Sequence, residues 1–391
     1  MSDSATRPAD KRVLIITASV GAGHNSVARA ISESLAGSGP INVTTIDSMD
    51  IVPSWFRKCY AGSFTLGMTR LPWVYGLGYV LTNRPQGLRR GLQERTRLAL
   101  ERRMLRRLRD YLLANRFDLL VHTHFLTVPP VARMKRRGMI ATPHFVTVTD
   151  VEVHRWWYSQ EVDHWFAPSD YSAQTLRRWG VAEERITISG MPIHPKWTAA
   201  LDRGRICAEW GLPADEPVVL LTGGTDFVCG PVMKIARGIL DRCGDAHVVV
   251  LAGRNKHLLE QVSATAPPGG RLRAVPFTDR GHELAEVCSL MVTKAGGVTT
   301  AECLARGTPM VLLKSAPGHE AGNARFLACN GAAVLTSSAD DAVTAVARLL
   351  ACPGLLKEMS ANGRRLYRPG REIITRAILA VLGLPVQEGA G

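Results

Sequence analysis

The sequence lacks the features that mark secreted, membrane-spanning and zinc-binding proteins. Its 8 cysteines include no CxxC pair, so we expect reduced, buried thiols rather than a disulfide framework or a zinc site. The first dozen residues hold no apolar stretch typical of a signal peptide, and no uninterrupted apolar run reaches the roughly 20 residues of a membrane-spanning helix. No Asp-x-Asp occurs near a predicted strand end, so no catalytic divalent metal is expected. These absences predict a globular cytoplasmic protein.

Basic residues are abundant, and one segment carries their whole excess. The 391-residue chain has a formal net charge of +14, and residues 51–140 hold 18 Lys and Arg against 4 Asp and Glu. Within this segment, one stripe of a predicted basic amphipathic helix carries Leu98, Leu105, Leu108 and Leu112. Seven aromatic residues precede that helix, namely Trp55, Phe56, Tyr60, Phe64, Trp73, Tyr75 and Tyr79.

This mixture of arginines and aromatic rings suits an anionic partner. Residues 55–112 could bind an anionic membrane surface, because aromatic rings insert among lipid headgroups and cationic side chains contact lipid phosphates. Stacking on bases together with phosphate contacts would instead suit a nucleic acid. A third interpretation is a solvated arginine-rich helix over a buried aromatic core.

Short apolar runs alternate with helical patterns in both halves of the chain. We predict strands at residues 13–17, 43–46, 119–122, 144–148, 186–189, 218–222, 248–251, 273–276, 290–293 and 310–313. Two prolines within residues 191–195 break the pattern, so we place a domain boundary between residues 195 and 196. The fold class is therefore α/β, with two domains that each hold a parallel sheet and helices on both of its faces. Ligands of such sheets bind at the carboxyl ends of strands, which makes the cleft between the domains the expected site.

The stretch TASVGAGHNSVARAI, residues 17–31, reads as the end of a strand, a glycine loop and the start of a helix. Asn25 or Ser26 is expected to cap that helix, and free N–H groups at its start would favour an anion. Residues 21–26 lack the third glycine of the dinucleotide-binding motif Gly-x-Gly-x-x-Gly, and no Gly-Lys-Ser/Thr of a P-loop follows them. His24 therefore either closes the turn or does chemistry that those motifs do not include.

Two glycine-rich loops follow strands in the second half. Gly224 and Thr225 come after one strand, and Gly296 and Gly297 separate another strand from a helix. Paired glycines let the backbone approach a phosphate closely. Glu302, one turn into that helix, could accept hydrogen bonds from both hydroxyls of a ribose, or it could be an ordinary solvated glutamate.

Several motifs occur together in one order. They are GAGH at 21–24, VTD at 148–150 with VHRWWY behind it, ISGMPIHPKW at 188–197, TKAGGVTTAECLARGTPMVL at 293–312 and PGHEAGN at 317–323. On these motifs the chain resembles the monogalactosyldiacylglycerol synthase and processive diacylglycerol glucosyltransferase family, which is related to the transferase that adds N-acetylglucosamine to a lipid-linked peptidoglycan precursor. The resemblance runs from about residue 11 to about residue 370.

The resemblance implies a GT-B architecture, in which two Rossmann-like domains face each other across a cleft. The first domain, residues 1–195, would bind the acceptor and the membrane, and the second, residues 196–391, would hold the UDP-sugar, with the last helix packing back on the first domain. The implied activity is the inverting transfer of a hexose from a UDP-sugar to a diacylglycerol-type lipid, without a metal and without a nucleic-acid partner, by a peripheral enzyme on the inner face of the cell membrane. A transferase with a soluble or different lipid-linked acceptor, a hydrolase or an epimerase of the same fold is the alternative.

The resemblance also assigns roles to residues. His24 would be the general base, and Asp150 would orient it or stabilise its charge, unless Asp150 only caps a turn. The donor-binding set places Gly224, Thr225, Gly296 and Gly297 at the diphosphate, with Lys294 beside its leaving charge, Phe277 at the uracil, Glu302 at the ribose, and His319, Glu320 and Asn323 at the sugar. Gly23, Val298 and Thr299 complete the set. Many family members have glutamine where this chain has His319, in a loop expected to touch the hydroxyls of the sugar, so the identity of the hexose stays open. Plant members also carry an aspartate before the glycine-histidine pair, which residues 17–20 lack.

Overall fold

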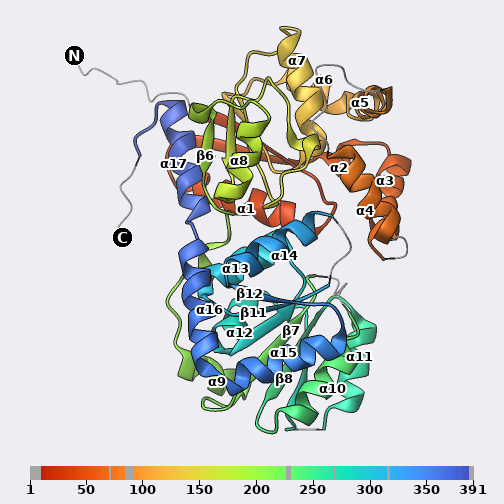
Figure 1. Ribbon diagram of the computed structural model, residues 1–391. Helices are drawn as coiled ribbons and strands as arrows, with labels where there is room; N and C mark the ends of the chain where they lie inside the picture. The colour runs from red at the N-terminus through yellow and green to blue at the C-terminus, as the bar shows by residue number, and fades with distance from the viewer. Residues whose placement is uncertain are drawn as a thin grey trace, which may run out of the picture.

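The computed structural model describes residues 10–69, 72–83, 92–225, 230–267, 269–314 and 318–386, with the backbone alone at 61, 63–69, 72 and 92–93. Two units stack one above the other, and each is built on a six-stranded parallel sheet (Figure 1). The N-terminal sheet, in the order β2-β1-β3-β4-β5-β6, comprises β1 Lys11–Thr17, β2 Ile41–Asp47, β3 Leu119–His122, β4 His144–Thr147, β5 His164–Ala167 and β6 Ile186–Ile188. The C-terminal sheet, in the order β12-β11-β10-β7-β8-β9, comprises β7 Val218–Thr222, β8 His247–Gly253, β9 Leu272–Pro276, β10 Leu290–Thr293, β11 Met310–Leu313 and β12 Ala333–Thr336.

Helices cover the sheets of both units. The N-terminal unit holds α1 Ala22–Ala36, α2 Ser48–Ile51, α3 Ser54–Thr69, α4 Pro72–Thr82, α5 Leu92–Met104, α6 Arg106–Ala114, α7 Val128–Arg136 and α8 Asp170–Arg178. The remaining helices are α9 Arg203–Trp210, α10 Val232–Arg242, α11 Lys256–Thr265, α12 Gly281–Val287, α13 Gly297–Arg306, α14 His319–Cys329, α15 Ala339–Ala351, α16 Pro353–Leu366 and α17 Gly370–Leu382.

The apolar runs of the sequence form strands because helices cover both faces of each sheet. In β1, Val13, Leu14, Ile15 and Ile16 are all fully buried, which is the environment that four consecutive large apolar residues require. The ten expected strands are present with small changes at their ends, whereas β5 and β12 were not expected. β5 reads His-Trp-Phe-Ala rather than an aliphatic run, and β12 lies at a sheet edge, where its two end residues are buried and Leu335 is exposed.

The last helix of the chain lies on the N-terminal unit. Figure 1 shows α17 beside α1 and α8, while α16 runs along the C-terminal unit. The Thr375 hydroxyl donates to the Ser34 hydroxyl of α1 over 2.8 Å. A Cβ on Gly370 would lie 2.7 Å from the Met191 carbonyl carbon, so the backbones touch where the chain returns. The division between residues 195 and 196 itself stays a prediction.

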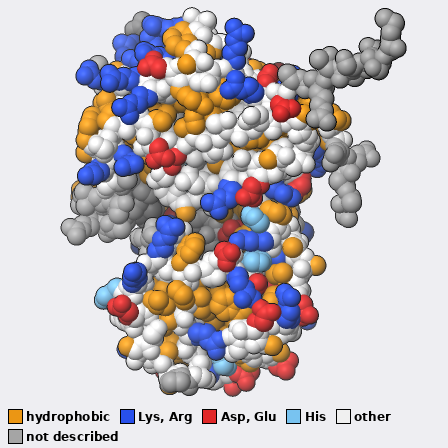
Figure 2. All heavy atoms as spheres, turned by 180° about the vertical axis from the view of Figure 1, so that it is seen from behind, with side chains coloured by type: hydrophobic (Ala, Val, Ile, Leu, Met, Phe, Trp, Pro, Cys, Tyr) orange, Lys and Arg blue, Asp and Glu red, His pale blue; other side chains and the backbone are white. Residues whose placement is uncertain are grey.

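The basic segment forms two helices rather than one, which corrects the expectation of a continuous amphipathic helix. The backbone leaves helical geometry at Leu105, between α5 and α6. This break lets Leu98, Leu105, Leu108 and Leu112 all be buried while arginines such as Arg102 and Arg106 stay exposed. Figure 2 shows Lys and Arg side chains gathered at the end of the N-terminal unit that lies away from the C-terminal unit.

The aromatic residues and cysteines divide between core and surface. Trp55 and Trp73 are exposed, whereas Phe56 is buried and Tyr60, Tyr75 and Tyr79 are half-buried; the side chain of Phe64 lies outside the described residues. Among the described cysteines, Cys207, Cys288 and Cys303 are buried, but Cys59, Cys329 and Cys352 are exposed, so the expectation of uniformly buried thiols was wrong. The described helices include none that is long and apolar enough to cross a bilayer.

Candidate active site

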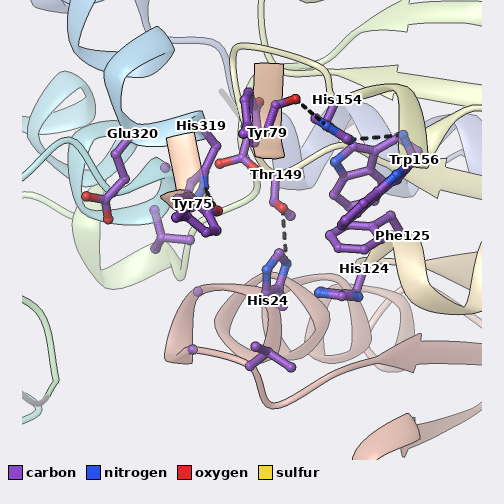
Figure 3. A pocket seen from close by; sticks show the side chains of 18 of the residues that line it. His24, Tyr75, Tyr79, His124, Phe125, Thr149, His154, Trp156, His319 and Glu320 are labelled. Carbon is purple, nitrogen blue, oxygen red and sulfur yellow. Dashed lines mark hydrogen bonds between the residues drawn. The ribbon is translucent and has the colours of Figure 1, made fainter. Parts of the chain in front are cut away.

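A cavity of about 550 Å³ lies between the two units. Its walls come from α3 and α4 and from segments that directly follow β1, β3 and β4 in the N-terminal sheet and β10 and β11 in the C-terminal sheet. These segments lie at carboxyl ends of parallel strands, the place where α/β sheets bind ligands. Figure 3 shows His24 on one wall, with an aromatic group around His124 and Trp156 to one side and His319 and Glu320 to the other.

Three helix N-termini meet at this cavity. They are the starts of α1 at Gly21 to Gly23, of α13 at Gly296 to Val298, and of α14 at His319 and Glu320. None of the three helices has a side-chain cap among the described residues. Uncapped first-turn N–H groups and the positive end of the helix dipole favour negative charge. The cavity is therefore suited to an anion such as a diphosphate.

His24 lies inside α1, not in a loop before it. The helix begins at Ala22 after Gly21, whose φ of 109° only glycine adopts easily. The expected cap at Asn25 or Ser26 was therefore wrong by about one turn. The Asn25 side chain instead accepts a hydrogen bond of 2.8 Å from the Thr17 hydroxyl, and Ser26 donates back to the Ala22 carbonyl.

The hydrogen bonds of His24 fix which ring nitrogen carries the proton. Its Nδ1 is 2.9 Å from the Thr123 carbonyl oxygen, and a carbonyl can only accept, so Nδ1 carries the hydrogen of the neutral ring. Nε2 is left with its lone pair. Burial lowers the pKa of His24, and the nearby Asp150 carboxylate and the Thr123 carbonyl oppose that shift. The ring is thus a neutral imidazole at the cavity wall, and Asp150 also lines the cavity.

Aromatic rings and two further histidines form the wall beside His24. The His124 ring packs edge-on against His24 with centroids 4.5 Å apart and stacks on Phe125 at 4.2 Å. His154 lies 4.5 Å from the Tyr79 ring and 4.8 Å from Trp156. Burial lowers the pKa of His124 far below its ordinary value and that of His154 to about 4, so both imidazoles are uncharged.

On the opposite wall, a partly buried ion pair joins two predicted donor-binding residues. The Lys294 ammonium is 2.6 Å from a carboxylate oxygen of Glu320, and Glu320 is almost fully buried. Lys294 therefore shares its charge with Glu320 and does not face the cavity as a lone cation. Beside this pair, His319 Nδ1 is 3.4 Å from the Tyr75 hydroxyl of α4.

The structure brings together some of the predicted donor-binding residues but not all of them. The cavity wall includes Gly23, Lys294, Gly296, Gly297, Val298, His319 and Glu320. Asn323 is fully buried and bridges the units, because its amide oxygen accepts from Val151 N over 2.8 Å and its amide nitrogen donates to the Ala295 carbonyl. Thr299 is half-buried and is not part of the wall.

Gly224, Thr225 and Phe277 lie outside the cavity wall, at the carboxyl ends of β7 and β9. Gly224 has a φ of 80°, and a Cβ there would lie 3.8 Å from Lys294 Cε, so this loop adjoins the ion pair. The exposed Phe277 ring lies under the Arg254 guanidinium at 5.2 Å. The expected contacts of Gly224 and Thr225 with the diphosphate and of Phe277 with the uracil stay predictions.

Glu302 is half-buried in α13 and is also outside the cavity wall. Burial raises its pKa to about 8, although the Lys196 ammonium works against the shift. No described residue donates a hydrogen bond to its carboxyl group, and none forms an ion pair with it. The half-buried side chain is open to water, so its role at the ribose stays a prediction.

Sequence reasoning did not assign Tyr75, Tyr79, His124 or His154 to the site. Tyr75 and Tyr79 are four residues apart in α4 and both line the cavity, whereas Trp73, Leu77 and Val80 of the same helix are exposed by 68%, 55% and 58%. The spacing places the two tyrosines on one side of a helix. Nothing in the sequence shows that this side faces the cleft.

Comparison with known proteins agrees with this architecture. Residues 24–193 match the family model "Monogalactosyldiacylglycerol (MGDG) synthase", and residues 218–362 match the "Glycosyltransferase family 28 C-terminal domain". A Bacillus subtilis (strain 168) protein named processive diacylglycerol beta-glucosyltransferase is 29% identical over 378 residues, 95% of each chain.

Two solved structures show the same fold at low sequence identity. The UDP complex of MnaA from S. aureus has a TM-score of 0.60 at 14% identity and covers 97% of this chain and 99% of its own. MurG from Acinetobacter baumannii has a TM-score of 0.59 at 16% identity and covers 95% and 99%.

Fold and family matches together define the class: the protein is a GT-B glycosyltransferase. Its resemblance to the monogalactosyldiacylglycerol synthase and processive diacylglycerol glucosyltransferase family, expected from the motifs, is confirmed. The expected enzyme class, a UDP-sugar-dependent hexosyltransferase, is confirmed with it.

Proposed function

We propose that the protein transfers a hexose from a UDP-sugar to the free hydroxyl of a diacylglycerol-type lipid, with inversion, at the cytoplasmic face of the membrane. The observation that carries the proposal is one cavity that joins three uncapped helix N-termini to a neutral histidine whose free nitrogen is an acceptor. The N-termini suit the diphosphate, and the histidine suits the acceptor hydroxyl.

The donor would lie across the starts of α13 and α14. First-turn N–H groups at Gly297 and Val298 would bind the diphosphate and stabilise the charge that UDP gains on leaving. Glu302 would accept hydrogen bonds from the hydroxyls of the ribose. Glu320, held by Lys294, would meet the hexose. No step of this proposal requires a metal.

The acceptor hydroxyl would lie between His24 and the donor. As its oxygen attacks the anomeric carbon from the side opposite UDP, Nε2 of His24 takes the proton, and the Asp150 carboxylate stabilises the imidazolium that forms. One displacement of this kind inverts the anomeric centre. The Bacillus subtilis relative is named a beta-glucosyltransferase, and a β product from an α-linked UDP-sugar agrees with inversion.

The membrane would meet the outer side of α4 and the basic helices. Trp73, Leu77 and Val80 form an exposed apolar stripe on α4, and Arg102, Arg103, Arg106 and Arg107 are exposed on α5 and α6. Apolar side chains that enter the headgroup region and arginines that meet anionic lipid act together in peripheral binding. The opposite side of α4 lines the cavity, so a lipid acceptor would enter beside it.

The test is transfer to lipid by the purified protein. Vesicles of phosphatidylglycerol with dioleoylglycerol are incubated with radiolabelled UDP-glucose, UDP-galactose, UDP-glucuronate or UDP-N-acetylglucosamine, and the lipid extract is separated. We expect a labelled lipid that depends on dioleoylglycerol, with a β linkage by NMR. Label released as free sugar, or a labelled epimer of the donor, at the same rate with and without dioleoylglycerol would overturn the proposal.

A further inference from the structure

We propose that the Tyr79 hydroxyl donates a hydrogen bond to an uncharged oxygen of the lipid acceptor, a hydroxyl or an ester carbonyl, and so selects acceptors that carry no phosphate at that place. This inference rests on the proposed function and assigns Tyr79 a direct contact with the acceptor.

The first observation is that the Tyr79 hydroxyl oxygen is buried and has no hydrogen-bond partner among the described residues. The rest of the residue is held firmly. Its ring packs against His154 at 4.5 Å and against Tyr75 at 6.4 Å, and its carbonyl oxygen is 3.3 Å from His154 Nε2. A fixed ring with an unsatisfied buried hydroxyl at a cavity wall requires an explanation, and a ligand oxygen provides one.

The second observation is the charge around that hydroxyl. The carboxylates of Asp150 and Glu152 both act on Tyr79 and, together with burial, raise its pKa, so the hydroxyl stays protonated and can donate. The neighbouring His24, His124 and His154 have lowered pKa values and are neutral. A phosphate placed here would meet two carboxylates without a cationic imidazole, so an uncharged oxygen fits better.

The third observation is the position of Tyr79 in α4. Figure 3 shows it across the cavity from His24, between His154 and His319. Tyr75 lies one turn earlier on the same side, and its hydroxyl faces His319 of the donor wall at 3.4 Å. The two tyrosines therefore divide the cavity: Tyr75 adjoins the donor and Tyr79 adjoins the acceptor.

Tyr79→Phe and Tyr75→Phe form a matched pair for the test, since each removes one hydroxyl from the same helix. Initial rates are measured with dioleoylglycerol varied at saturating UDP-sugar, and the reverse. For Tyr79→Phe we expect kcat/KM for dioleoylglycerol to fall roughly five- to tenfold, because one uncharged hydrogen bond to the acceptor is lost. The fall should come from a higher KM for dioleoylglycerol, and the KM for UDP-sugar should not change. For Tyr75→Phe we expect the opposite pattern, in which the KM for UDP-sugar rises and the KM for dioleoylglycerol does not change.

Two more readouts separate a ligand contact from a structural one. Because the hydroxyl has no protein partner, Tyr79→Phe should unfold at the wild-type temperature or slightly above it. The wild-type protein should label dioleoylglycerol but not the headgroup hydroxyls of phosphatidylglycerol in the same vesicles. A lowered unfolding temperature, an unchanged KM for dioleoylglycerol, equal acceptor effects in both variants, or labelled phosphatidylglycerol would each overturn the inference. If the wild-type protein labels no lipid at all, the proposed function fails instead.

Discussion

UDP binding should strengthen as the pH rises from 7 to 9, because Glu302 must ionise to accept the ribose hydroxyls. Burial raises the pKa of Glu302 to about 8 in the free protein. Hydroxyl donors stabilise the carboxylate over the carboxylic acid, so binding should release a proton. The diphosphate of UDP is almost fully ionised throughout this interval and contributes little to the change.

The size of the effect follows from the ionised fraction. With a pKa of about 8, roughly a tenth of the Glu302 carboxyl groups are ionised at pH 7 and roughly nine tenths at pH 9. Affinity scales with the fraction of protein in the competent state, so the Kd for UDP should fall roughly tenfold over these two pH units.

Isothermal titration calorimetry with UDP at pH 7, 8 and 9 measures this change, and Glu302→Gln is the matched control. Glutamine keeps the size of the side chain and cannot ionise. The variant should bind UDP with little pH dependence and, at pH 9, roughly tenfold to a hundredfold more weakly than the wild type, the range for a hydrogen bond to a charged group. Equal affinities of the two proteins at pH 9, or parallel pH dependence in both, would refute the assignment of Glu302 to the ribose.

Three further outcomes test the site and the membrane surface. His24→Ala should fold and bind UDP like the wild type but lower kcat by roughly a hundredfold or more. The wild-type rate should fall only below pH 6.5, because burial lowers the pKa of His24 from that ordinary value. Near wild-type turnover of the variant would show that His24 has a structural role. Binding to phosphatidylglycerol vesicles, measured by sedimentation, should weaken with added salt. Leu77→Ser should lower the affinity for the vesicles roughly tenfold. Leu335 is 45% exposed on the C-terminal unit, and Leu335→Ser should leave the affinity unchanged. Glu302→Gln should raise the unfolding temperature above pH 8 but not at pH 4.5. Because the pKa of Glu302 is raised in the folded state, the wild type loses stability as the pH rises from 4.5 to about 8. Differential scanning calorimetry of both proteins at pH 4.5 and above pH 8 tests this prediction.

The sequence predicts best what local pattern controls. Four buried apolar residues in a row defined β1, and the glycines on either side of Ala22 marked the helix start that carries His24. The start of that helix was misplaced because a backbone turn at Gly21, not a side-chain cap, begins it. β12 was missed although Ala332 to Leu335 are all apolar; the run is short, and as an edge strand β12 leaves Leu335 45% exposed.

Contacts between distant segments could not be predicted from the pattern. Asn323 looked like a sugar ligand from its motif, yet its side chain joins Val151 to Ala295 across the two units. Tyr75 and Tyr79 looked like part of a lipid-binding surface, but packing of α4 on His154 turned them into the cavity. In each case the decisive partner is tens to hundreds of residues away in the chain.

The arrangement of His24 explains how one cavity can bind an anionic donor and still contain a base. His24 lies in the first turn of α1, where the helix dipole disfavours a cation, and burial lowers its pKa further. The helix N-termini that suit a diphosphate thus also keep the imidazole neutral, which is the form that accepts a proton. Asp150 acts in the opposite direction on the pKa of His24, and in the proposed reaction it would stabilise the charged ring once the ring has taken the acceptor proton. A base held neutral before the reaction and stabilised as a cation during it needs both influences, so loss of Asp150 should slow transfer without weakening UDP binding.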